Sequence, residues 1–199
     1  MNELPTLLRE LQDRYQATTP SGMTSTDVPG VHFFWACEKL PRTPLVYTAG
    51  IIIIGQGHKI LYLGDHEIQY DQETYLVLGV PLPLECETFA TPEKPLLGIR
   101  IDVTIPMLHE LVMKLGDSVR FDSVEPSLTA RTGVEPVKMS QTMLESTTRL
   151  IKCLRNPLDS RVLGSAAVSE IIYRVLLSDK GRVLFDLTQH QSSYAAVAR

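Results

Sequence analysis

The stretch that decides the fold is "ILYLGDHEIQYDQETYLVLGVPLPLECE", residues 60–87. Apolar and polar residues alternate along it, which is typical of strands whose successive side chains point to opposite faces. Gly64-Asp65 supplies a tight turn between two alternating runs. The rhythm continues in "LVYTAGIIIIG" before it and "PLLGIRIDV" after it, with turn residues about every eight to twelve positions. The stretch therefore predicts an antiparallel barrel or sandwich.

Helical patterns flank this β region on both sides. Four leucines within residues 4–11 fall at helical spacing, which predicts an N-terminal helix. Thr104 and Gly116 can begin and end a second helix around "MLHELVMKL". Beyond it, two helices of about 20 residues, separated by Asn156-Pro157, predict an antiparallel hairpin.

These patterns divide the chain into four parts. The predicted fold class is α+β, with an antiparallel β-barrel followed by a C-terminal helical hairpin. The predicted parts are an N-terminal helix and arm at residues 1–27, a barrel at 28–103, a helical part at 104–181 and a tail at 182–199. We expect the tail to begin as a short extended piece and to continue as a linker.

Composition restricts the class of protein. The chain has 199 residues, which corresponds to one domain or slightly more. Its net charge of −4 disfavours a bare nucleic-acid-binding module, which is normally basic. No apolar run approaches the ~18 residues that cross a membrane, and the N-terminus lacks the apolar core of a signal peptide. Three widely spaced cysteines without a CxxC pair indicate reduced thiols. We therefore expect a cytoplasmic protein with no membrane partner.

The region from Pro44 to Val103 resembles the N-terminal domain of AraC-type transcription regulators. Its "GQGHK" turn is similar to a Gln-Gly-X-Lys hairpin of those proteins. Its tyrosine-bearing strand leads to a proline-bearing rim like theirs, and "PEKPLLGIRIDV" is similar to the strand that closes their barrel. The resemblance extends over roughly residues 18–190.

This resemblance implies a cupin-like barrel that binds a small-molecule effector, and a helical hairpin that forms a homodimer. It also implies that DNA is bound only through a C-terminal domain with two helix-turn-helix units, beyond Arg199. We therefore expect a regulatory domain excised from a longer regulator, with loss of the DNA-binding part as the alternative. Residues 4–15 are a candidate moving element, because chain termini cost little to order and release.

The barrel interior is the expected effector site, because ligand pockets are mostly apolar with a few placed polar groups. Arg100 lies among apolar neighbours and needs a partner, which is either a ligand anion or an internal carboxylate such as Asp102 or Glu85. Cys37 is either a reactive thiol or a small buried hydrophobe. About half of the candidates are expected to be plain core. The candidate ligand-binding residues are Phe34, Cys37, Tyr47, Ile52, Tyr62, Val80, Leu82, Glu85 and Arg100.

The helical part contains apolar residues that recur every seven positions. Such a seam either docks on the barrel or packs against a second copy, and the resemblance favours the second copy. Small polar residues at the alternate positions argue against a strong autonomous coiled coil. The expected dimer residues are Val137, Leu144, Ile151, Leu154 and Leu158.

The sequence contains no pattern typical of a catalytic site. His58 and His66 lie eight residues apart beside predicted turns, whereas a cupin metal site needs a His-X-His pair with a carboxylate. There is no G-x-S-x-G, P-loop or G-x-G-x-x-G motif. We therefore expect no enzyme activity, no catalytic residues, no metal and no cofactor. The alternatives are a cupin-type metal-dependent isomerase or dioxygenase, and an interaction scaffold without a pocket of at least ~300 Å³.

Overall fold

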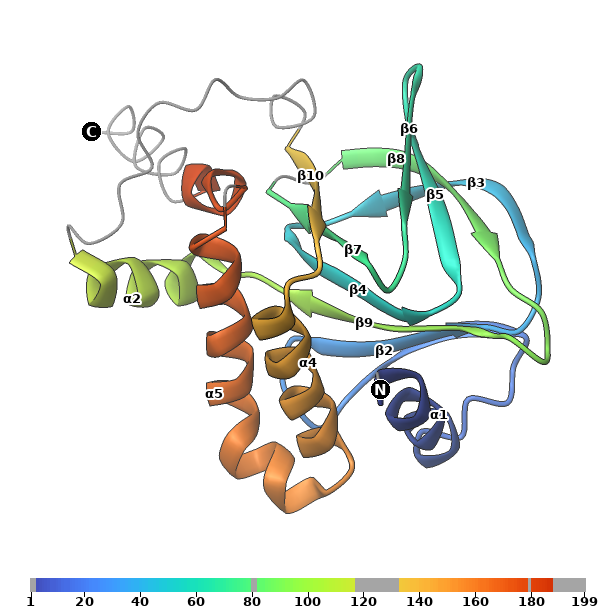
Figure 1. The fold of residues 1–199 in the computed structure, drawn as a ribbon, viewed down its shortest axis with the longest axis horizontal. Helices are drawn as coiled ribbons and strands as arrows, with labels where there is room; N and C mark the ends of the chain where they lie inside the picture. The colour runs from blue at the N-terminus through green and yellow to red at the C-terminus, as the bar shows by residue number, and fades with distance from the viewer. Residues whose placement is uncertain (1–2, 80–81, 117–132, 179, 188–199) are drawn as a thin grey trace.

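The structure is a computed structural model that describes residues 3–79, 82–116, 133–178 and 180–187. It confirms the α+β class, with two antiparallel sheets and helices that cover one of them (Figure 1). A six-stranded sheet has the order β1-β2-β9-β4-β7-β10, and a four-stranded sheet has the order β3-β8-β5-β6. The strands are β1 (Ser21–Ser25), β2 (Val31–Ala36), β3 (Leu40–Tyr47), β4 (Gly50–Gln56), β5 (His58–Leu63), β6 (His66–Tyr70), β7 (Thr74–Leu78), β8 (Leu82–Phe89), β9 (Leu96–Asp102) and β10 (Val134–Lys138). The helices are α1 (Leu4–Arg14), α2 (Ile105–Leu115), α4 (Gln141–Leu154) and α5 (Pro157–Leu176).

The two sheets face each other as a cupin-like, flattened barrel. Within the described ranges no hydrogen-bonded strand pair joins one sheet to the other, so the barrel is open along its seams. The sheet also draws on residues outside the predicted barrel at 28–103, because β1 and β10 form opposite edges of the six-stranded sheet. The predicted division into four parts stays a prediction.

The six-stranded sheet has two buried faces. In β4, Ile51 and Ile53 belong to the hydrophobic cluster on the helix side, and Ile52 and Ile54 belong to the cluster between the sheets. Residues that alternate between two apolar layers produce a continuous apolar run rather than a polar and apolar alternation. This explains the four consecutive isoleucines, and it makes the sheet a single wall between barrel interior and helices.

Helix α1 docks on the helix side of that wall. Pro5 lies in its first turn, and its four leucines are at most 4% exposed. Gly55 permits this close approach, since a Cβ atom there would lie 2.2 Å from Leu8 Cδ1. Two ion pairs connect α1 to the region of α4, one from Glu3 to Lys152 at 2.6 Å and one from Glu10 to Arg155 at 2.6 Å. Helix α1 therefore contacts both the sheet and the helical part.

Helices α4 and α5 form the predicted antiparallel hairpin on the same side of the sheet (Figure 1). Their starts are capped, because Ser140 Oγ accepts a hydrogen bond from Met143 N at 3.2 Å and Asn156 Oδ1 accepts one from Leu158 N at 2.8 Å. Helix α4 begins at Gln141, later than the seven-residue spacing predicts.

The placement of Val137 in a helix was wrong. Val137 lies in β10 and pairs with Tyr75 of β7 in antiparallel register. The seven-residue interval between Val137 and Leu144 therefore joins a strand to a helix and has no helical meaning. A second correction concerns the tail, because residues 182–187 are helical rather than extended.

The predicted turns are confirmed. Gly64 and Asp65 form the two-residue connection of the β5–β6 hairpin, whose last pair is Leu63 with His66. Gly64 has a φ of 58°, and Gly57, between β4 and β5, has a φ of 82°. Glycine adopts this left-handed region without the steric cost of a Cβ atom. Gly57 lies where the chain passes from the six-stranded to the four-stranded sheet, and Gly64 turns the chain within the four-stranded sheet.

Candidate functional site

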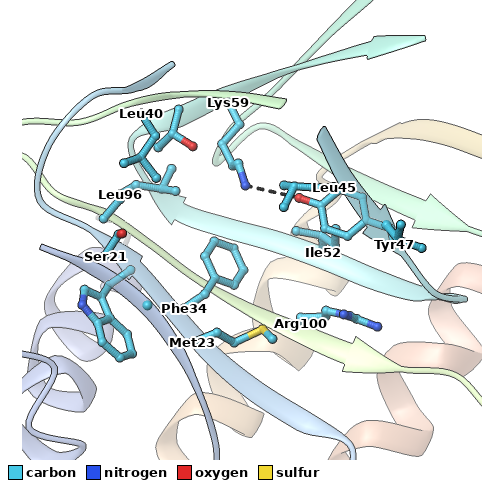
Figure 2. Close-up of a pocket in the computed structure, with 15 residues that line it drawn as sticks. Ser21, Met23, Phe34, Leu40, Leu45, Tyr47, Ile52, Lys59, Leu96 and Arg100 are labelled. Atoms are coloured by element: carbon cyan, nitrogen blue, oxygen red, sulfur yellow. Dashed lines mark hydrogen bonds between the residues drawn. The ribbon is translucent and has the colours of Figure 1, made fainter. Parts of the chain in front are cut away.

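A cavity of about 310 Å³ lies between the two sheets (Figure 2). One end of the cavity is lined by β1 and β3, which are edge strands of their respective sheets. Its apolar wall comes from both sheets and consists of Met23, Phe34, Leu40, Leu45, Ile52 and Leu96.

A missing side chain helps to shape this wall. Gly98 of β9 pairs with Phe34 of β2, and a Cβ atom at Gly98 would lie 2.4 Å from Phe34 Cζ and 2.5 Å from the carbonyl oxygen of Ile53. No side chain therefore fits at this position. The phenyl ring of Phe34 occupies that space and lies over the sheet as part of the cavity wall.

A cluster of polar groups lies on the four-stranded-sheet side. Lys59 Nζ donates a hydrogen bond to Tyr47 Oη at 3.2 Å, as Figure 2 shows. The Tyr47 hydroxyl also lies 3.3 Å from the Tyr70 hydroxyl and 3.7 Å from Cys86 Sγ. Burial raises the pKa of Tyr47 and raises that of Tyr70 well above its ordinary value. Both phenols are therefore neutral at physiological pH and act as hydrogen-bond donors and acceptors.

Arg100 reaches the cavity from β9, and its charge is satisfied inside the protein. It forms an ion pair with Asp102 at 2.9 Å and donates a hydrogen bond to Thr48 Oγ1. Asp102 also lies 2.9 Å from His32 Nε2, so one carboxylate serves two neighbours. Of the two partners that the sequence allowed, an internal carboxylate or a ligand anion, the structure pairs Arg100 with the internal one.

The β1 and β3 side of the cavity is apolar and exposed. Met23 on β1 is 55% exposed, and Leu45 and Val46 on β3 are 38% and 70% exposed. All three line the cavity. An apolar molecule entering here would remove their exposed surface from water, which is favourable at about 25 cal/mol per Å².

The family model described as AraC-type transcriptional regulator N-terminus matches residues 27–183, which is most of the chain. The chain belongs to this family. The resemblance found in the sequence is therefore confirmed.

Several solved structures of ToxT from Vibrio cholerae are similar to this AraC-type chain. An apo ToxT variant has a TM-score of 0.46 and 9% identity, with 72% of this chain and 55% of that chain covered. ToxT bound to an unsaturated fatty acid has a TM-score of 0.44 and 8% identity, with 79% and 55% covered. A further ToxT structure has a TM-score of 0.44 and 8% identity, with 89% and 84% covered. The chain thus spans about half the length of the first two. No curated protein matches the sequence.

The structure brings four of the nine candidate ligand residues of the AraC-type domain to the cavity. They are Phe34, Tyr47, Ile52 and Arg100. Cys37 does not join them, because its thiol lies 3.6 Å from Gln12 Nε2 of α1 and packs against the helix-side core. Val80 and the side chain of Leu82 lie outside the described part of the chain.

The inward orientation predicted for Tyr62 and Glu85 was wrong. Both lie on the outer face of the four-stranded sheet and are paired in register across β5 and β8. Glu85 forms an ion pair with Arg42, whose guanidinium lies 4.0 Å from the ring centroid of Tyr62. The Tyr62 hydroxyl donates to Glu87 at 2.9 Å. Their partners are surface charges, so neither side chain contributes to the cavity.

The sequence interpretation missed Lys59, Met23 and Leu96 as cavity residues. A signal for Lys59 was present, because alternation places it on the same face as Leu61, which is fully buried. Choosing Tyr62 for the interior excluded Lys59, which lies three residues earlier in β5 and therefore on the opposite face. Met23 had no signal, since β1 lies before the region that the alternation identified.

Two further findings concern the described residues only. They contain no group of three or more histidine, cysteine, aspartate or glutamate side chains placed to hold a metal ion. None of their helices has the length and apolar character needed to span a membrane.

Proposed function

We propose that this chain is the ligand-sensing regulatory domain of an AraC-type transcriptional regulator. A small organic effector binds in the cavity between the sheets and controls an attached helix-turn-helix domain that binds DNA. The observation that carries the proposal is the apolar cavity of about 310 Å³ in a chain of this family. Its volume lies at the lower end of ligand pockets, which range from ~300 to ~1,000 Å³. A filled scaffold would have no such space.

The wall between cavity and helices supplies a route for the signal. Phe34 lies on the cavity side of β2, and its neighbours Phe33 and Trp35 belong to the helix-side core. Phe33 stacks on Trp35 with ring centroids 5.8 Å apart and on Tyr15, just after α1, with centroids 6.1 Å apart. A ligand that repositions Phe34 therefore acts on β2 and on the aromatic stack behind it. The ligand shifts the balance between two arrangements of β2 and this stack only if it binds one of them more tightly than the other.

Helix α1 remains the proposed moving element, but its buried leucines limit how far it can move. Fully burying one leucine stabilises by about 1.5–3 kcal/mol, and four leucines of α1 are buried. Complete release of α1 would lose all of this burial. We therefore expect a small shift of α1 over the sheet rather than its detachment.

Dimerisation is part of this proposal, with a revised surface. Ile151 and Leu154 are 0% exposed and belong to the helix-side core, and Leu144 packs against it. Leu158 is 63% exposed and begins an apolar patch on α5 with Val162 and Leu163, which are 66% and 50% exposed. A second copy packed on this patch through a twofold axis would cover it. The patch replaces the seven-residue seam as the proposed dimer contact.

The net charge of −4 disfavours direct contact between this domain and DNA. In the proposed function, an attached domain contacts DNA in the cytoplasm. Catalysis is not part of the proposed function.

Native mass spectrometry of the purified protein, with and without a metabolite extract, tests the proposal. We expect a reproducible organic adduct, and a melting temperature about 5–10 °C higher at a ligand concentration of 100 times Kd. Ile52→Phe on β4 fills the cavity and should abolish the adduct. Ile60→Phe on β5 is the control, because Ile60 lies on the face of β5 that is turned away from the cavity, and this variant should retain the adduct. A stoichiometric transition metal, or the same adduct on Ile52→Phe, would contradict the proposal.

A further inference from the structure

We propose that the effector is an organic monoanion with an apolar body, and that Lys59 and Tyr47 hold its acid group. This inference rests on the proposed function, and it names the chemical class of the ligand. It begins from a positive charge in the cavity that the described protein residues do not neutralise.

Lys59 is a cation without a carboxylate partner among the residues that the structure describes. Its only hydrogen bond among the described residues is the one to Tyr47 Oη, and no carboxylate of those residues lies within 4.0 Å of its Nζ. The ammonium group has three donors, so two remain for a ligand. The rings of Phe34 and Tyr47, with centroids 5.9 Å from Nζ, are its other close neighbours. A charge in such surroundings is costly unless an opposite charge joins it.

The nearby carboxylates are already occupied on the other face of the same sheet. Glu85 pairs with Arg42, and Glu87 pairs with Lys39 at 2.9 Å. Both extend from β8 away from the cavity, because they alternate with Cys86 and Thr88, which are buried. A movement of either side chain would break an existing ion pair, so neither serves as a reserve partner for Lys59.

Arg100, the second cation at the cavity, does not need an anionic group of the ligand. Arg100 already pairs with Asp102 at 2.9 Å. Its Nε has no hydrogen-bond partner among the residues that the structure describes. That atom is buried from solvent, and Asp102 already balances the charge, so Arg100 presents no unpaired charge to a ligand. One uncompensated positive charge fits a monoanion better than a phosphate ester or a dicarboxylate.

The rest of the cavity fits an apolar body. Phe34, Ile52 and Leu96 form the wall beyond Lys59, and Met23 and Val46 lie exposed at the β1 and β3 side. A cavity of about 310 Å³ lies near the lower limit of ligand pockets, which begin at ~300 Å³. This fits an aromatic acid or a medium-chain aliphatic acid. A sugar would leave most of its hydroxyl groups without partners on this wall.

The test uses the single tryptophan of the chain as its reporter. Trp35 follows the cavity residue Phe34 in β2 and stacks on Phe33 behind the sheet, so its fluorescence reports a movement of Phe34 on binding without a label. The probes are decanoate, decanol and decylamine, which share one tail and differ in charge. At neutral pH we expect decanoate to bind roughly ten- to a hundredfold more tightly than decanol, since a hydrogen bond to a charged group is worth about 1.5–3 kcal/mol. Decylamine should bind most weakly.

Two substitutions separate the role of Lys59 from net charge. Lys59→Met should remove the preference for decanoate over decanol while leaving the affinity for decanol within about twofold, because the aliphatic stem is retained. Lys39→Met, on the outer face, changes the net charge by the same amount and should leave the preference intact. Lys59→Arg should retain most of it.

Each outcome decides between the two proposals. Equal binding of decanoate and decanol to the wild type overturns the anion inference but leaves the cavity as a ligand site. A preference that survives in Lys59→Met overturns it in the same way. If no probe binds while the metabolite adduct persists, the inference fails and the proposed function stands. If the adduct is also absent, both fail.

Discussion

At the scale of single residues, whether a strand residue lines the cavity depends more on the face of the strand that it occupies than on its side-chain type. Phe34, Ile52 and Arg100 line the cavity, but the sequence did not fix which face of their strands is turned to it, because β2, β4 and β9 carry apolar residues on both faces. Tyr62 was placed on the wrong face because alternation fixes which residues share a face and not which face is buried. An aromatic side chain was expected in the interior, but the ring of Tyr62 packs under Arg42 and its hydroxyl donates to Glu87 at the surface.

Gly98 gives a prediction at this scale. Gly98→Ala should lower the free energy of unfolding by about 1–3 kcal/mol, because the new methyl group overlaps the Phe34 ring and the Ile53 carbonyl oxygen. It should also change the fluorescence of Trp35, which neighbours Phe34. Urea denaturation followed by tryptophan emission measures both. In Gly64→Ala, where no atom lies within 4 Å of the added Cβ, only backbone strain is expected and the native emission should be unchanged. Wild-type stability of Gly98→Ala would contradict this account.

At the scale of elements, local signals identified α1, α2 and the α4–α5 hairpin, while β10 escaped them. Strand β10 pairs with β7, about 60 residues earlier in the chain, and such a non-local partner leaves no mark on the spacing of apolar residues. Val137 was therefore assigned to the nearest periodic pattern. The α4–α5 pair also contains a polar link without a sequence signal, since Glu170 of α5 contacts Arg149 at 2.5 Å and the buried Ser146 at 2.9 Å, both on α4.

This link predicts a pH-dependent contribution to stability. The hydrogen bond from Arg149 holds the pKa of Glu170 below its ordinary value of 4.5, with help from Ser146. A carboxylate with a lowered pKa in the folded state stabilises fully above the unfolded pKa and loses this contribution as the pH falls through the folded pKa. Glu170→Gln should therefore cost roughly 0.5–1 kcal/mol at pH 7, since Arg149 is half exposed, and the cost should begin to fall at about pH 4.5 and vanish below the lowered pKa of folded Glu170.

Denaturation midpoints of wild type and variant from pH 3 to 7 check this expectation. Glu110→Gln is the matched control, because Glu110 pairs with Lys114 on the surface of α2 and both side chains are about 70% exposed. Solvent screens that pair, so the control should show no measurable change at any pH. A cost in Glu170→Gln that is independent of pH would show that shape, not charge, explains the contact.

At the scale of the whole molecule, the sequence was sufficient for the family and the α+β class. It was not sufficient for the assembly surface. The apolar seam of α4 was expected to face a second copy, but it belongs to the helix-side core, and α4 packs on α5 and α1. Periodicity shows that a helix has an apolar face, and only the three-dimensional arrangement shows whether that face is already used.

The exposed patch on α5 predicts the oligomeric state. Val162→Asp places a charge at the centre of the patch and should convert the proposed dimer into a monomer at micromolar concentration, because a desolvated charge without a partner disfavours association. Sedimentation-equilibrium ultracentrifugation measures the change. Met113→Asp, at an 81% exposed methionine on α2, is the control and should leave the dimer intact. A dimer that persists in Val162→Asp would exclude this surface.

The seam between β1 and β3 has a consequence for the rates of exchange. Both strands are edges, and no hydrogen-bonded ladder crosses from one to the other, so side chains alone close the barrel on this side. A molecule can leave without breaking the main-chain ladder of either sheet once Met23, Leu45 and Val46 move apart, and its residence time then depends on the contacts that hold it inside. Side-chain and loop motions of this kind occur on nanosecond to microsecond timescales. Opening of this seam is therefore fast, and the strength of the contacts inside the cavity limits how quickly the occupancy follows the concentration of the ligand.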